Sequence, residues 1–190
     1  MHNNLPNIFT FINSFEKDYI RKLDKKIGII FRDYSKKIDK NLIQEINIFC
    51  QKNNRKFFLS NNVKLATNLN LDGVYIPAFN KKMNIIMKSS KRRFVIIGSA
   101  HNVREIKIKE KQGVEVIFLS PLFKTSKSSK FLNPIKFNIL ASKTKKKVIA
   151  LGGINSKNIN KLKIIKSYGF AGISCFKNDV KINIINNEYR

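Results

Sequence analysis

The chain has 190 residues, 43% of them hydrophobic, so it is long enough to bury a proper core and too apolar for a disordered segment. No apolar run reaches the roughly 18 residues that a membrane-spanning helix needs, and the first residues lack the basic end and apolar core of a secretory signal. We therefore expect one cytoplasmic domain over residues 1–190, with no membrane partner.

The net charge is +26, because 38 lysines and arginines face only 12 aspartates and glutamates. Such a charge favours a nucleic-acid partner when the basic residues form one patch. Here the lysines are spread over nearly all the expected helices and loops, and tryptophan is absent, so no surface for stacking bases is evident. We expect phosphorylated small molecules as partners; the lysine-rich segment 124–130 is where a nucleic acid would bind if the basic charge were used that way. Oligomeric state has no signature in the sequence.

Eight short apolar runs are predicted to be strands. In chain order they cover residues 7–12, 27–31, 56–59, 73–76, 94–98, 114–119, 147–151 and 170–174. Helical patterns lie between most of them, and Asn102-Val-Arg-Glu105 is expected to form a cap with Glu at the third helical position, a capping-box arrangement. These predicted helices cover residues 15–22, 38–50, 63–67, 103–111, a stretch that ends at Ser142, and 155–167.

Strands that alternate with helices indicate a parallel α/β fold, and the count of eight favours a closed (β/α)8 TIM barrel over a doubly wound sheet. Because this fold usually takes about 200 residues or more, the barrel has to be compact, with short helices and loops. Cys50 and Cys175 lie in apolar patterns and are expected to be buried free thiols.

A strand-to-helix turn at residues 148–156 carries a strong local signal. Four apolar residues run into Gly152-Gly153, which let the backbone turn sharply and let an anion approach the N–H groups without meeting a Cβ. Asn155 or Ser156 is expected to cap the helix that follows, whose N-terminus would add the positive end of its dipole. The pattern indicates a phosphate cradle, repeated more weakly at 170–174. The alternative is that the two glycines only make a tight turn.

Several motifs resemble the thiamine phosphate synthase/TenI superfamily. They are Ile96-Ile-Gly-Ser-Ala-His-Asn102, Phe118-Leu-Ser-Pro-Leu-Phe-Lys-Thr125, Val148-Ile-Ala-Leu-Gly-Gly-Ile154 and Gly169-Phe-Ala-Gly-Ile-Ser174, with looser matches at 30–33 and 71–76. The resemblance covers most of the chain in order, and it implies a (β/α)8 barrel. It also implies the family's reaction, in which hydroxymethylpyrimidine diphosphate is joined to a thiazole phosphate with release of pyrophosphate.

The resemblance also implies roles for single residues. Arg32 matches an arginine that contacts the diphosphate, and a guanidinium fork suits bidentate phosphate contact. Ser99 matches a serine near the reacting centre, so these two residues are the catalytic candidates. The alternatives are an ordinary surface arginine and a serine that caps a helix. The thiazole phosphate is expected to contact the following residues: Thr125, Lys127 (or Lys130 in its place), Gly152, Gly153 and Ser174.

The first half of the site departs from the family pattern. Two carboxylates that bind Mg²⁺ in the family are replaced here by Asn61 and Asn80, and a neutral amide oxygen is a poorer ligand for this cation. The case for Mg²⁺, the cofactor that the resemblance implies, is therefore weakened, and no metal ligand is assigned. Tyr34 takes the place of a family lysine. We hypothesise that Lys or Arg side chains hold the diphosphate without a metal.

The TenI branch of the superfamily, described as thiazole tautomerases, has its catalytic histidine where this chain has Pro121. His101 is the remaining imidazole that would titrate in the barrel; the alternative is a helix-start residue with a satisfied ring. The sequence favours a thiamine phosphate synthase-like transferase of thiamine biosynthesis. The alternative is a catalytically impaired or TenI-like barrel that binds thiazole phosphate without turnover.

Overall fold

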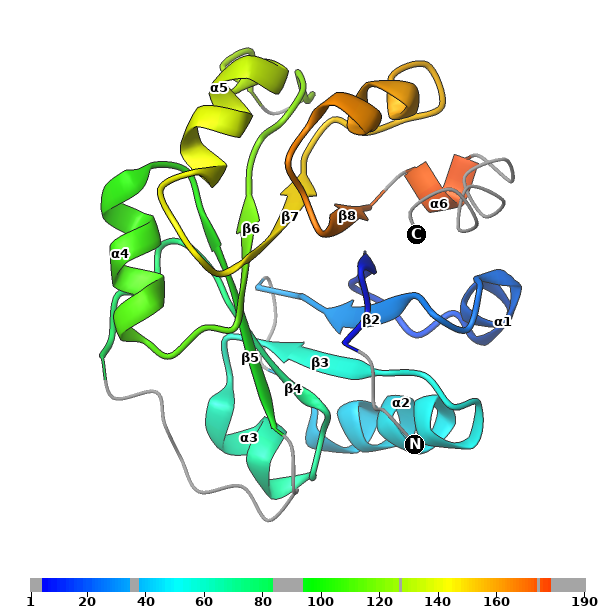
Figure 1. The fold of residues 1–190 in the computed structure, drawn as a ribbon. Coiled ribbons are helices and arrows are strands. Elements are labelled where there is room, and N and C mark those ends of the chain that lie inside the picture. Colours follow the sequence, from blue (N-terminus) through cyan, green and yellow to red (C-terminus); the bar gives the residue numbers. More distant parts are fainter. Residues whose placement is uncertain (1–4, 35–37, 84–93, 127, 174, 179–190) are drawn as a thin grey trace.

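The computed structural model describes residues 5–34, 38–83, 94–126, 128–173 and 175–178. Eight parallel strands close into a barrel in chain order, with the last strand pairing with the first (Figure 1). They are β1 (Ile8–Ile12), β2 (Gly28–Phe31), β3 (Phe57–Ser60), β4 (Gly73–Ile76), β5 (Val95–Ala100), β6 (Val116–Leu119), β7 (Lys147–Leu151) and β8 (Gly169–Gly172). This confirms the predicted (β/α)8 barrel, and every predicted strand is present.

Short helices surround the strands (Figure 1). They are α1 (Lys17–Lys22), α2 (Lys40–Lys52), α3 (Val63–Asn68), α4 (Val103–Lys111), α5 (Asn133–Ala141), the 3₁₀ helix η1 (Ile159–Ile164) and α6 (Cys175–Asn178). Their shortness is what lets 190 residues complete the barrel. Cys50 and Cys175 are buried free thiols, as predicted, and burial raises the pKa of Cys50 to about 12.

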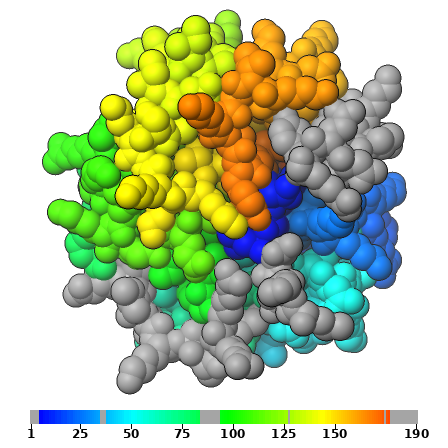
Figure 2. Space-filling view, viewed as in Figure 1, coloured from blue at the N-terminus to red at the C-terminus, as the bar shows by residue number. Residues whose placement is uncertain are grey.

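Aromatic rings fill the inside of the barrel, to which each of the eight strands contributes buried apolar side chains. Phe9 and Phe118 lie 5.1 Å apart between ring centroids, and Tyr75 lies 5.2 Å from Phe11 and 5.6 Å from Phe118. Such tilted and edge-on contacts are favourable beyond the area that they bury. The interior is therefore packed, and Figure 2 shows side chains, including those of the dark-blue N-terminal strand, filling the middle of the face in view.

The connection between β7 and β8 differs from the prediction. A helix over 155–167 was expected, but a turn comes first and the 3₁₀ helix η1 begins at Ile159. Asn158 causes this, since its Oδ1 accepts the Asn155 N–H (2.9 Å) and its Nδ2 donates to the Gly153 carbonyl (2.8 Å). The predicted cap by Asn155 or Ser156 is therefore wrong. The buried residues Ile159, Leu162 and Ile165 recur every three positions, which is the period of a 3₁₀ helix.

The cap of α4 agrees with the prediction in its first half. Asn102 Oδ1 accepts the Glu105 N–H (2.9 Å), while the Glu105 carboxylate reaches back to the N–H of His101 (2.7 Å) and not to that of Asn102.

No helix in the described ranges is both long and apolar enough to cross a bilayer.

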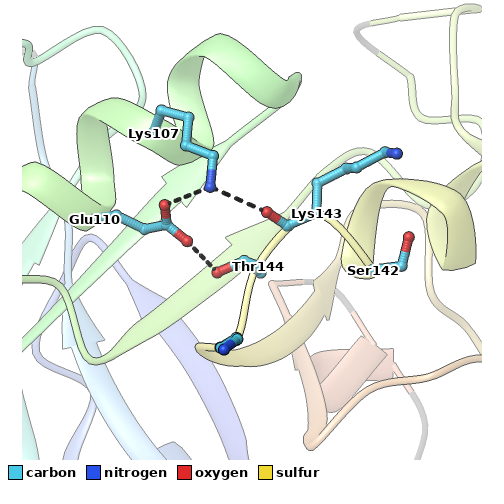
Figure 3. Close-up of a pocket in the computed structure, with 6 residues that line it drawn as sticks. Lys107, Glu110, Ser142, Lys143 and Thr144 are labelled. Carbon is cyan, nitrogen blue, oxygen red and sulfur yellow. Dashed lines mark hydrogen bonds and ion pairs between the residues drawn. The ribbon is translucent and has the colours of Figure 1, made fainter.

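A surface cavity of about 400 Å³ lies between α4 and the segment that leads from α5 into β7 (Figure 3). Glu110 joins its two walls: its carboxylate accepts from Lys107 Nζ at 2.8 Å and from Thr144 Oγ1 at 2.6 Å. Lys107 Nζ also donates to the Lys143 carbonyl at 3.3 Å. The cavity opens where β7 begins, whereas the active sites of such barrels lie where the strands end, so its contacts are structural.

We expect Glu110→Gln to lower the free energy of unfolding by roughly 0.5–1.5 kcal/mol at pH 7. Hydrogen bonds from Lys107 and Thr144 lower the pKa of Glu110. Its stabilising contribution is therefore present above the unfolded pKa of about 4.3 and is lost as the pH falls through the lower folded value. Urea unfolding of both proteins across this pH range measures the difference.

The matched control is Glu45→Gln, because Glu45 pairs with Lys17 at 2.8 Å while both side chains are about half exposed. An exposed pair contributes little, so this variant should change stability by less than about 0.5 kcal/mol. Equal losses in the two variants would contradict the role given to Glu110.

Candidate active site

Arg32 lies at the end of β2, directly above the aromatic filling of the barrel. Its N–H donates to the Ile12 carbonyl at 2.8 Å, which continues the pairing of β1 with β2. Its guanidinium carbon lies 4.4 Å from the centroid of the Phe11 ring, a cation–π contact. This contact fixes a positive charge over the mouth of the barrel, in the position expected for a residue that binds a phosphorylated ligand.

The hydroxyl of Ser99, on β5, forms hydrogen bonds with residues of β4 and of the segment after it. Burial raises the pKa of Tyr75 to about 12, against a smaller lowering by its hydrogen bond with Ser99. Ser99 Oγ also accepts the N–H of Ala78 at 3.0 Å, and the residue is 4% exposed. Ser99 therefore holds Tyr75 and the first residues after β4, and its proposed part in the chemistry remains a prediction.

An exposed aromatic pair forms part of the rim, which is the edge of the barrel mouth where the strands end. Tyr34 donates to or accepts from Ser60 Oγ at 2.7 Å, and its ring lies edge-on to Phe79 at 5.6 Å. The two rings are 53% and 63% exposed, which is unusual for such large apolar groups. Phe79 was not singled out from the sequence; its signal is an aromatic residue in the segment that follows the end of β4.

Asn61 and Asn80, which the resemblance places at two carboxylate positions, contact each other. Asn61 follows β3 and Asn80 follows β4, and Asn80 Nδ2 donates to Asn61 Oδ1 at 2.7 Å. Asn61 has a left-handed backbone (φ 59°), which asparagine tolerates better than most residues. Two neutral amides bonded to each other do not fit Mg²⁺, which prefers carboxylate oxygens, and the described residues hold no group of three His, Cys, Asp or Glu side chains suited to a metal.

A buried lysine, which was not singled out from the sequence, holds the segment after β4 in place. Lys109 of α4 is fully buried, and its ammonium donates to the carbonyls of Pro77 and Asn80 (2.8 Å each) and to Gln112 Oε1 (2.9 Å). Gln112 in turn donates to the carbonyls of Asn80 and Lys82. Burial lowers the pKa of Lys109 to about 8. These bonds fix the segment that carries Phe79 and Asn80.

His101 lies at the end of β5 with its ring fixed by Ser120. Its Nδ1 is 2.7 Å from the Ser120 carbonyl and 3.2 Å from Ser120 Oγ. Because the carbonyl only accepts, Nδ1 carries the proton and Nε2 is left as the acceptor of the neutral ring. The exposed ring is thus held in one orientation at the rim.

Gly152 and Gly153 lie beneath the loop that follows β6. Both have left-handed φ values (98° and 71°), and a Cβ on Gly153 would come within 2.4 Å of the Lys124 carbonyl oxygen. The loop is held there by the N–H of Phe123, which donates to the Gly152 carbonyl at 3.0 Å. The close approach of the loop therefore explains why both positions are glycine. In the described part of the chain, the N–H groups of Gly153 and Ile154 have no acceptor, so they could still bind an anion.

The remaining phosphate-binding candidates belong to the same loop or lie next to β8. Thr125 forms a tight turn with Ser128, whose N–H donates to Thr125 Oγ1 at 3.1 Å. The structure brings this loop against the end of β7, and a shared role in phosphate binding stays a prediction. Lys127 and Ser174 lie outside the described residues.

Comparison with known proteins identifies the family. The sequence model described as "Thiamine monophosphate synthase" matches residues 23–176, which include every residue of the site just described apart from Phe11 and Ile12. The chain belongs to this family.

Individual relatives agree with the match. A thiamine-phosphate synthase of Flavobacterium johnsoniae is 30% identical over 169 residues, covering 83% of this chain and 79% of its own. One of Helicobacter pylori is 31% identical over 128 residues, covering 65% of this chain and 58% of its own. Among solved structures, a thiamine phosphate pyrophosphorylase from Pyrococcus furiosus superposes with a TM-score of 0.77 over 97% of this chain and 96% of that one, at 20% identity, which shows the shared fold.

We expect Gly153→Ala to cost roughly 1–3 kcal/mol of stability, because the added Cβ meets the Lys124 carbonyl and a left-handed backbone disfavours alanine. Thermal unfolding measures the loss. Ser156→Ala, an exposed change in the same turn, is the control and should leave the midpoint nearly unchanged. An unaltered midpoint for Gly153→Ala would show that the loop does not rest on the glycine.

We expect Lys109→Met to lower the free energy of unfolding by roughly 2–4 kcal/mol, since three acceptors lose their buried donor. Lys111→Met, on the exposed side of the same helix, should change it by less than about 0.5 kcal/mol. Urea unfolding compares the two. If both variants were as stable as the wild type, the bonds of Lys109 would not support this segment.

Proposed function

We propose that this protein is a thiamine phosphate synthase, which joins hydroxymethylpyrimidine diphosphate to a thiazole phosphate and releases pyrophosphate. The observation that carries the proposal is the family match over residues 23–176, within which Arg32 is seated at the mouth of the barrel. Two phosphorylated substrates are also consistent with the rim, which offers a cationic side chain at the end of β2 and, beyond β7, N–H groups without an acceptor among the described residues.

The reaction makes modest demands on the side chains. The bond between the pyrimidine methylene carbon and the diphosphate oxygen breaks first, and the electron pair leaves with pyrophosphate. The thiazole nitrogen then gives its lone pair to the methylene carbon of the pyrimidine cation. This chemistry needs positive charge near the leaving group and little general-base catalysis, because no proton has to be removed before bond formation.

The residues of the rim fit these steps as follows. Arg32 would neutralise the leaving diphosphate, since its guanidinium is fixed over Phe11 and always charged. The exposed faces of Tyr34 and Phe79 offer contact for a planar ring that carries positive charge. The N–H groups of Gly153 and Ile154 would bind the phosphate of the thiazole. Mg²⁺ has no part in these steps, because the amide pair does not suit it.

A second function is favoured by one observation, the replacement of both family carboxylates by Asn61 and Asn80. A barrel that has lost the diphosphate half of its site would bind thiazole phosphate without turnover. Such a protein would be stabilised by that ligand through mass action, by about 2.7 kcal/mol at a ligand concentration of 100 Kd, and would form no product.

The test is formation of thiamine phosphate from the two substrates, with Mg²⁺ and with a chelator in its place. We expect product from the wild type, and a fall in kcat of about 100-fold in Arg32→Gln, because one preorganised charge on the leaving group is lost. Arg21→Gln, an exposed residue of α1, should act like the wild type. Stabilisation by thiazole phosphate with no product under either condition would favour the binding protein, and no response to either substrate would refute both.

A further inference from the structure

The amide pair at the ends of β3 and β4 is the part of the rim that differs most from a metal site. Asn61 and Asn80 are 19 positions apart in the chain and 2.7 Å apart between Oδ1 of the first and Nδ2 of the second. Adjacent strands bring them together, since β3 and β4 pair in parallel up to Ser60 and Tyr75. The pair is therefore fixed by the barrel and not by a local turn.

The hydrogen bonds determine which way both amides face. The main-chain N–H of Lys82 lies 3.0 Å from Asn80 Oδ1, and a main-chain N–H only donates, so this atom of Asn80 has to be the oxygen. Its Nδ2 therefore faces Asn61 and donates, which makes the Asn61 atom at 2.7 Å an oxygen as well. Turning either amide over would place two donors against each other.

This orientation turns the oxygens inward and leaves the N–H groups outward. Each side-chain oxygen already accepts a hydrogen bond from the protein. The second hydrogen of Asn80 Nδ2 and both hydrogens of Asn61 Nδ2 meet no acceptor in the ranges that the structure describes. Asn61 is exposed and Asn80 is half-buried, so a ligand can reach these donors. Donors select an anion, whereas a metal ion needs the oxygens.

Fixed positive charges near Asn61 and Asn80 also favour an anion over a metal ion. The buried ammonium of Lys109 lies 2.8 Å from the main-chain carbonyl oxygen of Asn80, and Arg32 lies at the end of the adjacent strand β2. Both charges attract an anion and repel a divalent cation, and Lys109 acts from the protein interior, where screening is weak. Carboxylates at these two positions would reverse the preference.

We propose that Asn61 and Asn80 bind the diphosphate of the substrate, and the pyrophosphate that leaves, directly through their N–H groups and without a metal ion. The inference rests on the proposed function, and it assigns to this chain a metal-independent form of that site. In place of a metal ion, the amide pair stabilises the diphosphate by hydrogen bonding, and Arg32 supplies positive charge.

Calorimetric titration of the full chain with inorganic pyrophosphate tests the proposal. We expect binding in the presence of a chelator, with no tighter binding when Mg²⁺ replaces the chelator. This measurement needs no variant and therefore does not depend on whether any substitution folds. If pyrophosphate bound the wild type only with Mg²⁺ present, or not at all, the proposal would be wrong.

Variants separate the amides from the rest of the site. The double change Asn61→Asp and Asn80→Asp keeps side-chain shape but places negative charge opposite the ligand. We expect it to weaken pyrophosphate binding in chelator by about tenfold or more, which is about 1.4 kcal/mol or more, and Mg²⁺ to restore part of it. Asn62→Asp is the control for charge: it adds one negative charge, half of that in the double variant, one residue away, where the side chain caps α3 through the Leu65 N–H and aspartate caps equally well. It should weaken binding by no more than about twofold, a factor well below that of a contacting residue.

Thiazole phosphate, titrated separately, distinguishes the two levels of the proposal. If thiazole phosphate binds and pyrophosphate does not bind in chelator, the metal-independent site is refuted while the proposed family of substrates remains. If neither ligand binds, the proposed function itself fails. If Asn62→Asp lost half or more of the binding free energy that the double variant loses, net charge, and not contact with the amides, would control affinity.

Discussion

The packing of aromatic rings inside the barrel is the constraint on which the rest of the structure depends. Phe9, Phe11, Tyr75 and Phe118 meet from β1, β4 and β6, and they leave no room for a ligand within the ring of strands. A small molecule cannot enter the middle of the barrel, so the active site is expected where the strands end. The filling also acts as the floor of the site, because the guanidinium of Arg32 rests on Phe11 and Tyr75 is held by Ser99. Packing energy and site geometry thus come from the same side chains.

The rim above this floor has two halves of different character. Over β2 to β4 the groups are side chains: a guanidinium, two exposed rings and a pair of amides. Beyond β7 they are the main-chain N–H groups of Gly153 and Ile154, next to the loop after β6 that crosses closely over the glycines. The two phosphorylated substrates of the proposed reaction would need two such halves. The side-chain half has changed its donor chemistry, whereas main-chain N–H groups cannot be changed in this way by substitution.

Much of the fold was predictable from the sequence, because it depends on local patterns. Each strand is a short apolar run, and the Asn102–Glu105 spacing correctly placed the start of α4. The stretch before β8 was mistaken for an α-helix because an apolar residue every three positions was taken for the similar spacing of an amphipathic helix. The turn made by Asn158 also involves Gly153, five residues away, so capping rules at Asn155 and Ser156 could not reveal it.

The site was predictable only in part. Arg32, Asn61 and Asn80 were found as positions in a family pattern, but the contact between the two amides depends on strand pairing across 19 residues. Lys109 was missed because lysine is rarely buried, and nothing in its neighbours distinguishes it from the exposed lysines of α4. Phe79 lacked a periodic pattern, since its segment is neither strand nor helix.

The burial of Lys109 has a mechanical consequence for the barrel. Its ammonium belongs to α4, while two of its three acceptors belong to the segment after β4. Moving that segment toward a ligand would either pull the helix along or strand a charged group in an apolar interior, at a cost of several kcal/mol. The segment from Pro77 to Lys82 is consequently held against α4 as a rigid wall on this side of the rim.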